Sequence, residues 1–344
     1  MSAAVLFGSF FVLLLLTVPI GYAIGISSLI AIYYFSDIPL IIIAQKSITG
    51  VDSFPLLAIP FFMLAGNLMS SGGIARRLVN FFDALIGHVT GGLGMVTIIV
   101  CMFFAAISGS AVATVSAVGA FMIPEMVDHG YNKPFSAALT AAAGTIGVII
   151  PPSIPFVIYG VVSGTSITDM FTAGFMPGIM MGAALMIVCY FVSKKNGYRG
   201  KEKASSAKEI WVAFKDAFWA ILSPVIILGG IYSGFFTPTE AAVISVVYSF
   251  IVGVFVYKEL DVRGAYKSFK DAIVVNGATT FMVGFSTVFA AFLTMAQIPN
   301  MIAQAILGLT DNAILILLII NIFLLIVGMF IDNIPATIIL TPIL

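Results

Sequence analysis

The sequence predicts an all-α polytopic membrane protein, and composition is the first observation behind this fold class. Hydrophobic residues make up 61% of the 344-residue chain and charged residues only 9%, with a mean hydropathy of +1.16. An average soluble domain carries about 25% charged residues. The polar surface that water requires is therefore missing, and apolar surface must face a lipid bilayer. The formal net charge of +0 gives no indication of a nucleic-acid partner.

The second observation is a series of about ten apolar segments, several of which approach the roughly 20 residues that a helix needs to cross the hydrocarbon core. The apolar stretches cover residues 3–17, 19–35, 54–70, 93–107, 111–127, 135–164, 172–192, 217–235, 239–257, 274–296 and 313–331. A short turn at Pro19 separates the first two. The sequence therefore predicts a bundle of helices that cross the membrane repeatedly.

The third observation is the distribution of Lys and Arg, which predicts the orientation of the helices. No Lys or Arg precedes Lys46, so the N-terminus lacks the basic region of a secretory signal peptide. Basic residues cluster at Arg76-Arg77, over 194–215 and over 258–270. The positive-inside rule places all three clusters in the cytoplasm. Counting the helices back from Arg76 then places the N-terminus outside.

The segment 92–127 is predicted to be a re-entrant helical hairpin. An even number of crossings must separate the first two cytoplasmic clusters, and the stretches 135–164 and 172–192 already supply two. The remaining segment must then enter and leave on the same side. Its short arms and the Ser108-Gly109-Ser110 tip favour a hairpin, although two complete short spans would satisfy the same count.

Broken hairpins in membrane transporters commonly accompany inverted repeats, and the sequence indicates two. The first repeat is predicted over 1–195, with scaffold spans, an arm helix over 74–89, the hairpin and a broken helix over 134–165. A basic cytoplasmic loop over 196–215 follows. The second repeat is predicted over 216–344 and ends within a second hairpin that enters from outside. We therefore expect the C-terminus to be truncated.

Two helix starts are predicted from local patterns. The arm helix places Ile74, Leu78 and Phe82 on one face, which suggests that it lies flat in the membrane interface; the alternative is an extension of the preceding span. Residues Thr237 to Glu240 form the pattern of a capping box with proline at the first helical position. Glu240 is therefore expected to have a structural role.

Two breaks in predicted helices are the candidate binding site. Ser108-Gly109-Ser110 separates two half-helices, and Gly147 with Pro151-Pro152-Ser153 interrupts a long span. Broken helices inside a membrane are tolerated where they line a cavity or bind a ligand. Their C-terminal ends offer carbonyl groups to a cation and their N-terminal ends offer N–H groups to an anion. The pattern therefore predicts a joint site for sodium and an anionic solute, against the alternatives of helix packing and a proline kink.

Asp332-Asn333 is predicted to form the tip of the second hairpin. An acidic residue in an apolar setting is a candidate functional residue in a membrane protein. The alternative is a solvated turn at the membrane surface.

These motifs together resemble the large membrane subunit of the tripartite ATP-independent periplasmic (TRAP) transporters, and the resemblance covers the whole chain. It is carried by the hairpin Ile107–Thr114, the break at Gly147 to Ser153, the turn Gly234–Ala242 and the tip at Asp332. It implies an elevator-type fold like that of the ion-transporter superfamily, in a bacterial inner (cytoplasmic) membrane with a periplasmic N-terminus. It also implies sodium-coupled import of small carboxylates such as sialic acid or C4-dicarboxylates. The implied partners are a small four-span membrane subunit and a periplasmic substrate-binding protein.

The resemblance also implies roles for particular residues. Sodium would bind at the two tips and the first break, at Ser108, Gly109, Ser110, Gly147, Pro151, Asp332 and Asn333. The solute would contact Ser110, Thr114, Pro152 and Ser153. The implied departure from the family is the missing C-terminal segment, which leaves half of the second sodium site without residues.

Three other functions differ from this one in what they require. A stand-alone sodium/dicarboxylate symporter would share the hairpins and repeats but would need no binding protein. A channel would conduct without a sodium requirement. An enzyme is not expected, because the sequence shows no nucleophile–base pair, no metal-ligand cluster beyond the sodium sites and no phosphate-binding loop at Gly200-Lys201.

Overall fold

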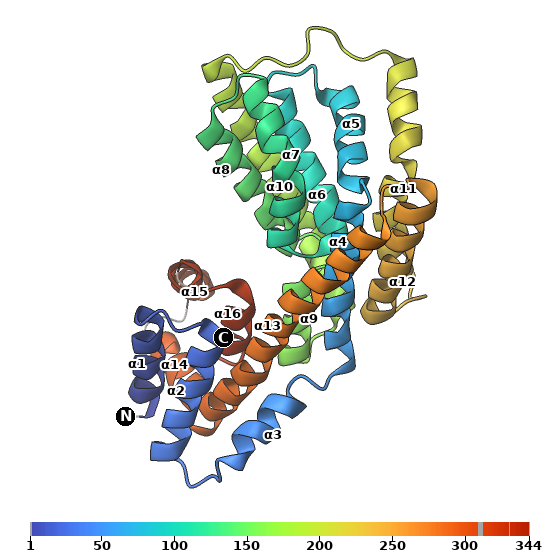
Figure 1. Ribbon diagram of the computed structural model, residues 1–344. Helices are drawn as coiled ribbons and strands as arrows, with labels where there is room; N and C mark the ends of the chain where they lie inside the picture. The colour runs from blue at the N-terminus through green and yellow to red at the C-terminus, as the bar shows by residue number, and fades with distance from the viewer. Residues whose placement is uncertain (1, 309–311, 330, 344) are drawn as a thin grey trace. The chain divides into compact units, whose positions relative to one another are not determined.

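A computed structural model of the chain describes residues 2–308, 312–329 and 331–343, and the regular elements within these ranges are helices (Figure 1). Six of the described helices are long and apolar enough to cross a membrane, fewer than the apolar stretches suggested. They cover Phe54–Ser71, Ala111–Asp128, Ile167–Asn196, Ala207–Tyr232, Pro238–Val256 and Val262–Met295. Other apolar helices are shorter because breaks containing Gly, Ser or Pro end them. The chain is thus an all-helical polytopic membrane protein.

The chain forms two compact units, and the first contains Met1–Leu56, Ile158–Thr165 and Val274–Leu344. The helices of unit 1 are α1 (Ser2–Leu15), α2 (Ile20–Phe35), α3 (Ile41–Thr49), α14 (Ile298–Leu307), α15 (Ala313–Gly328), α16 (Asn333–Leu340) and the later parts of α9 (Ile154–Ser163) and α13 (Val262–Met295). Helix α1 packs against α2, and Phe7 and Phe10 both make edge contacts with Phe289 of α13. Phe10 and Phe289 are buried in the core of unit 1, and the partly buried Phe7 packs against it.

Unit 2 contains Leu57–Val157 and Ser166–Ile273. Its helices are α4 (Ala58–Ser71), α5 (Ile74–Ile86), α6 (Gly92–Ser108), α7 (Ala111–Asp128), α8 (Lys133–Gly144), α10 (Ile167–Asn196), α11 (Ala207–Tyr232), α12 (Pro238–Ile251) and the first parts of α9 and α13. Helix α6 contacts α5, α7, α8 and α10, while α12 packs on α4 (Figure 1). Each unit contains segments from before and from after the basic loop over 196–215, so the division into two repeats stays a prediction.

Helix α5 has its apolar face buried in protein, and its position in the membrane interface stays a prediction. Its apolar residues Ile74, Leu78 and Phe82 are buried in the core of unit 2. The helix contacts α6 and α11, so protein rather than lipid covers its apolar face (Figure 1). Sequence reasoning could not separate these cases, because a lipid interface and a protein groove impose the same amphipathic pattern.

The start of α12 confirms the predicted capping box. Glu240 Oε2 accepts a hydrogen bond of 2.8 Å from Thr237 N, and Thr237 Oγ1 accepts one of 3.3 Å from Glu240 N. Pro238 occupies the first helical turn, where its missing N–H costs nothing. Glu240 therefore has the structural role that its sequence context predicted.

Candidate functional site

The connection between α6 and α7 is a tight turn built by three residues. Helix α6 ends at Ser108, Gly109 adopts a left-handed conformation with φ of +61°, and Ser110 is the extended N-cap of α7. Ser110 Oγ accepts a hydrogen bond of 3.4 Å from Ala113 N. The local sequence folds in this way because glycine tolerates positive φ and serine caps the next helix.

Hydroxyl and carbonyl oxygens gather inside this turn. Thr114 Oγ1 donates a hydrogen bond of 2.8 Å to the Ser110 carbonyl and lies 3.1 Å from Ser108 Oγ. The Ser108 hydroxyl also lies 3.4 Å from the Ser110 carbonyl oxygen. Ser108 and Thr114 are both fully buried. The turn therefore offers a buried group of oxygen ligands of the kind that hard cations prefer.

The break between α8 and α9 packs directly against this turn. Helix α8 ends at Gly144, a 3-10 turn covers Thr145–Val148, and α9 begins at Ile154. Ile154 N donates a hydrogen bond of 3.2 Å to the carbonyl oxygen of Gly109. A Cβ atom added to Gly109 would lie 2.7 Å from the carbonyl oxygen of Pro152. The backbone of the turn at Gly109 thus lies directly against the backbone of the break at Pro152, and the missing side chain of glycine makes this close approach possible.

Gly147 and Ser153 complete the contact between the two breaks. A Cβ atom added to Gly147 would lie 2.9 Å from Thr114 Oγ1 and 3.0 Å from the Ser110 carbonyl oxygen. The buried Ser153 hydroxyl donates to the Val148 carbonyl at 2.6 Å, which closes the break from inside. The structure thus brings together the predicted residues Ser108, Gly109, Ser110, Thr114, Gly147, Pro151, Pro152 and Ser153.

Four helix ends converge in this cluster, and their dipoles define its electrostatics. The C-terminal ends of α6 and of the 3-10 turn after α8 direct carbonyl groups towards it, and the N-terminal ends of α7 and α9 direct N–H groups towards it. The predicted residues of the cluster carry no charged side chain. Backbone groups therefore supply the field, which favours a cation at the C-terminal ends and an anion at the N-terminal ends.

Gly66 on α4 is a residue of this cluster that sequence reasoning missed. A Cβ atom added to Gly66 would lie 2.9 Å from Ser108 Cβ, so α4 approaches the end of α6 closely at this point. The available signal was the Gly66-Asn67 pair inside an otherwise apolar stretch. Such a pair marks close helix packing without naming the partner.

Asp332 and Asn333 lie at the start of α16 in unit 1. Asp332 is the exposed N-cap, with φ of −63° and ψ of 156°, and Asn333 is the first helical residue. Thr337 Oγ1 donates to the Asn333 carbonyl at 2.7 Å. A carboxylate at this position is favoured by the N-terminal end of the helix. The assignment of both residues to a second sodium site stays a prediction.

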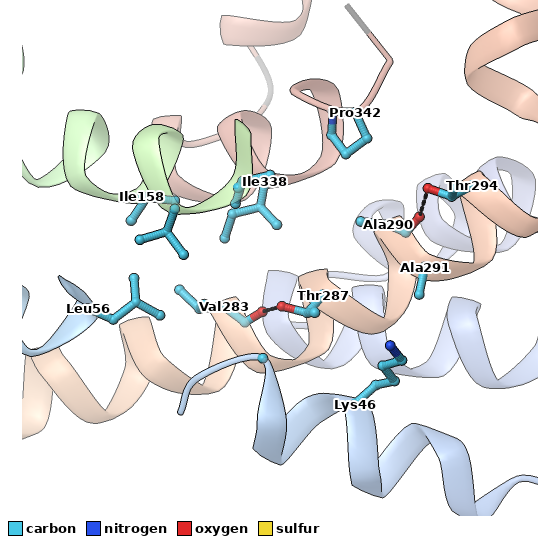
Figure 2. A pocket seen from close by; sticks show the side chains of 13 residues that line it. Lys46, Leu56, Ile158, Val283, Thr287, Ala290, Ala291, Thr294, Ile338 and Pro342 are labelled. Carbon is cyan, nitrogen blue, oxygen red and sulfur yellow. Dashed lines mark hydrogen bonds between the residues drawn. The ribbon is translucent and has the colours of Figure 1, made fainter. Parts of the chain in front are cut away.

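Unit 1 also contains a cavity of about 330 Å³ that sequence reasoning did not predict (Figure 2). Figure 2 shows the Lys46 side chain pointing towards α13, with aliphatic side chains opposite. The Thr287 and Thr294 hydroxyls donate to carbonyls of their own helix at 3.0 and 2.9 Å. The lining residues include none of the predicted site residues. The two chain breaks of unit 2 are therefore the stronger candidate site.

A family model described as the DctM component of the tripartite ATP-independent periplasmic transporter matches residues 7–344. The isethionate TRAP transporter permease protein DctMQ of Oleidesulfovibrio alaskensis is 46% identical over 340 residues, which are 99% of this chain and 54% of that protein. The sialic acid TRAP transporter large permease protein SiaM of Vibrio cholerae is 41% identical over 332 residues, covering 96% of this chain and 78% of that protein.

The C4-dicarboxylate TRAP transporter large permease protein DctM of Rhodobacter capsulatus is 36% identical over 358 residues, covering 100% of this chain and 81% of that protein. The chain thus spans 54% of the length of the isethionate permease and a larger share of the other two. These relatives are named as transporter permeases, not as enzymes. The chain therefore belongs to the DctM component family of tripartite ATP-independent periplasmic transporters, a family of transport proteins.

Proposed function

We propose that the chain is the membrane transport subunit of a sodium-coupled importer, which moves small carboxylates of the sialic acid or C4-dicarboxylate type into the cytoplasm by an elevator mechanism. The observation that carries the proposal is the hydrogen bond between Ile154 N and the Gly109 carbonyl, with the close approach of Gly147 to Ser110. These contacts unite two helix breaks into one cluster. Clusters of broken helices are where secondary transporters bind solute and coupling ions.

The buried oxygen group supports sodium as the coupling ion. Ser108 Oγ, Thr114 Oγ1 and the Ser110 carbonyl lie within hydrogen-bonding distance of one another. A sodium ion there would take carbonyl and hydroxyl ligands in place of water, at the negative end of the α6 dipole. Gly147 and Pro151 belong to the facing break and would form the other wall. Asp332 and Asn333 would serve a second sodium ion.

The helix N-termini support an anionic solute. Ser110 caps α7 and Ser153 caps α9, so their hydroxyls lie at two helix N-termini, whose positive dipole ends would favour a carboxylate. Thr114 and Pro152 lie next to these serines. The relatives are named for isethionate, sialic acid and C4-dicarboxylates, all organic anions. The proposed solute shares this chemistry.

The family's tripartite organisation supports two partner proteins. We assign them as a small four-span membrane subunit and a periplasmic substrate-binding protein that delivers the solute. The proposed location is the bacterial inner membrane, with the N-terminus in the periplasm, because the basic residues cluster in loops assigned to the cytoplasm. In the elevator mechanism, the cluster of unit 2 would carry solute and sodium across the bilayer.

The second candidate function is a stand-alone sodium/dicarboxylate symporter, which the same site chemistry would serve. Uptake by proteoliposomes separates the two. The full-length protein would be reconstituted with its small subunit, and labelled sialic acid, succinate or isethionate would be added with and without binding protein. We expect uptake of at least one of these anions that needs both an inward sodium gradient and the binding protein. Uptake of free solute without binding protein would support the symporter, and gradient-independent flux would contradict both.

A further inference from the structure

Helix α5 joins α4 to α6, and a glycine turn lies at each of its ends. Gly73 precedes α5 with φ of +74°, and Gly91 precedes α6 with φ of +76°. Glycine adopts such angles without steric cost, so the backbone changes direction at both turns. Because α6 ends at Ser108 in the candidate site, these two turns, together with the contact of Gly66 with Ser108, set where the site lies relative to α4.

The guanidinium group of Arg77 holds the first turn. Arg77 Nη1 donates to the Gly73 carbonyl at 3.1 Å and lies 2.7 Å from Glu259 Oε1, while Nε donates to Asp216 Oδ1 at 3.2 Å. The guanidinium carbon lies 3.8 Å from the centroid of the Tyr257 ring. We call these five residues the Arg77 hub. Arginine suits this position because its planar group makes several directed bonds and also stacks on an aromatic ring.

Tyr257 connects the hub to the backbone of α11. Ala220 N donates a hydrogen bond of 3.1 Å to the Tyr257 hydroxyl, which donates one of 2.9 Å to the Asp216 carbonyl. The phenol therefore bridges an N–H and a carbonyl that lie one helical turn apart. Burial raises the pKa of Tyr257 to about 12, so the hydroxyl keeps the proton that it donates. The residue follows a π-helical turn over Val252–Val256 at the end of α12.

The second turn is held by the segment that follows α10. Gly91 N donates to the Tyr198 carbonyl at 3.1 Å, and Lys201 N donates to the Gly87 carbonyl at 2.9 Å. The Lys201 ammonium also pairs with the Asp83 carboxylate, but the Lys201 side chain is 51% exposed. In the described part of the chain, Asp83 Oδ1 is buried without a hydrogen-bond partner.

The two turns therefore differ in how firmly they are held. The Arg77 side chain is only 15% exposed; it contacts the Gly73 carbonyl of its own turn and two carboxylates and a ring from other segments of unit 2. Charge-assisted bonds gain strength when they are shielded from water and share a network. The ion pair of Lys201 is screened by solvent and contributes little. Side-chain contacts thus hold the turn at Gly73 more firmly than the turn at Gly91, which relies on two backbone hydrogen bonds.

We propose that Arg77 is a positioning residue for transport. It anchors the turn between α4 and α5 on α11 and on the end of α12. The candidate site and α6 then move about the other turn, at Gly87 to Gly91. This inference rests on the proposed function and adds the residue that holds the stationary end of α5. Without the hub, the Gly73 end of α5 can also move. The site then reaches the position needed for transport less often, although the residues that bind sodium and solute are unchanged.

The test compares Arg77→Gln with three other variants in the reconstituted transport complex. Arg77→Lys keeps the positive charge but loses the several directed hydrogen bonds of the guanidinium group and its stacking on the Tyr257 ring. Lys201→Gln removes the ion pair at the second turn. Arg76→Gln is the matched control, because Arg76 is the neighbouring residue, is exposed and is not one of the five residues of the hub. The maximal rate and the half-saturating solute concentration are measured for each, together with the thermal unfolding midpoint.

We expect Arg77→Gln to lower the maximal rate about tenfold, with a half-saturating concentration within about twofold of wild type, because a conformational step and not binding is affected. Arg77→Lys should recover part of the rate, and Arg76→Gln and Lys201→Gln should stay within about twofold of wild type. A rate that falls only in proportion to the fraction of folded protein would overturn the proposal. So would a stronger loss in Lys201→Gln than in Arg77→Gln.

Hydrogen exchange tests the same proposal without transport. The Ala220 amide donates to the Tyr257 hydroxyl of the hub, so Arg77→Gln should raise its exchange about tenfold while Arg76→Gln leaves it unchanged. Unchanged exchange at Ala220 in Arg77→Gln would overturn the proposal. Absence of sodium-driven uptake in the wild type would instead contradict the proposed function, and the exchange data would then decide the role of Arg77 alone.

Discussion

The Ile154 amide donates a hydrogen bond of 3.2 Å to the Gly109 carbonyl, and this bond joins the start of α9 to the turn that ends α6. Residues 45 positions apart in the sequence thereby become direct neighbours in unit 2. The bond brings an N-terminal helix end to a C-terminal one, so positive and negative ends of backbone dipoles meet at one place. The predictions below concern the side chains and glycines that shape this place.

Gly109→Ala should abolish sodium-driven uptake. The substitution places a Cβ atom 2.7 Å from the Pro152 carbonyl oxygen and forces alanine to a φ of +61°. The left-handed conformation alone costs roughly 1–2 kcal/mol, and the clash moves the two breaks apart. Gly130→Ala is the control, since Gly130 has φ of +84° but open space around it. Equal uptake by both variants would show that the contact with Pro152 is unimportant.

Gly147→Ala should raise the sodium concentration needed for half-maximal uptake. The new methyl group would press on Thr114 Oγ1 at 2.9 Å and on the Ser110 carbonyl at 3.0 Å, and overpacking of this kind costs about 1–3 kcal/mol. Gly229→Ala provides a control at a helical glycine with open space. Sodium titrations of uptake measure the effect, and an unchanged sodium dependence in Gly147→Ala would argue against a sodium ion at this turn.

Thr114→Val should weaken sodium binding about tenfold, the effect expected for the loss of one buried oxygen ligand. Valine keeps the shape of threonine but removes the hydroxyl that contacts Ser108 and Ser110. Thr114→Ser should restore most of the affinity. Thr140→Val is the matched control, because the buried Thr140 hydroxyl also donates at 2.8 Å to a carbonyl four residues back. If both valine variants behave alike, the hydroxyl of Thr114 has only a structural role.

Asp332→Asn and Ser110→Ala should each abolish sodium-driven uptake while the protein stays folded. Asp332 would lose the negative charge of the second proposed sodium site, and Ser110 the hydroxyl that caps α7 beside the proposed solute. Asp169→Asn is the control for charge, because Asp169 is an exposed acid in the first turn of another helix, α10. Monodispersity on size-exclusion chromatography reports folding. Normal uptake in Asp332→Asn and Ser110→Ala would refute the site assignment.

The features that could be predicted from the sequence are those with local causes. Gly109 and Ser110 mark a turn through backbone freedom and capping, and Thr237 with Glu240 marks a helix start through the geometry of one helical turn. The polytopic class follows from composition, because lipid and water select different surfaces. None of these predictions required knowledge of distant contacts.

The features that could not be predicted depend on tertiary packing. The amphipathic pattern of α5 is the same whether Leu78 faces lipid or the core of unit 2, where the structure places it. Nothing in the sequence around Tyr257 indicates that its hydroxyl enters α11 between Ala220 and Asp216. The pattern of two helix breaks predicts that Gly109 and Pro152 meet, but the geometry of the contact follows only from the folded chain.

The joint site for sodium and an organic anion at the two helix breaks is tested most directly by solute binding to the purified full-length protein. Isothermal titration with sialic acid, succinate and isethionate would be performed in sodium and in potassium at equal ionic strength. The account predicts binding of one of these anions in sodium, at least about tenfold weaker binding in potassium and loss of this difference in Thr114→Val. Equal affinity in sodium and potassium would contradict it.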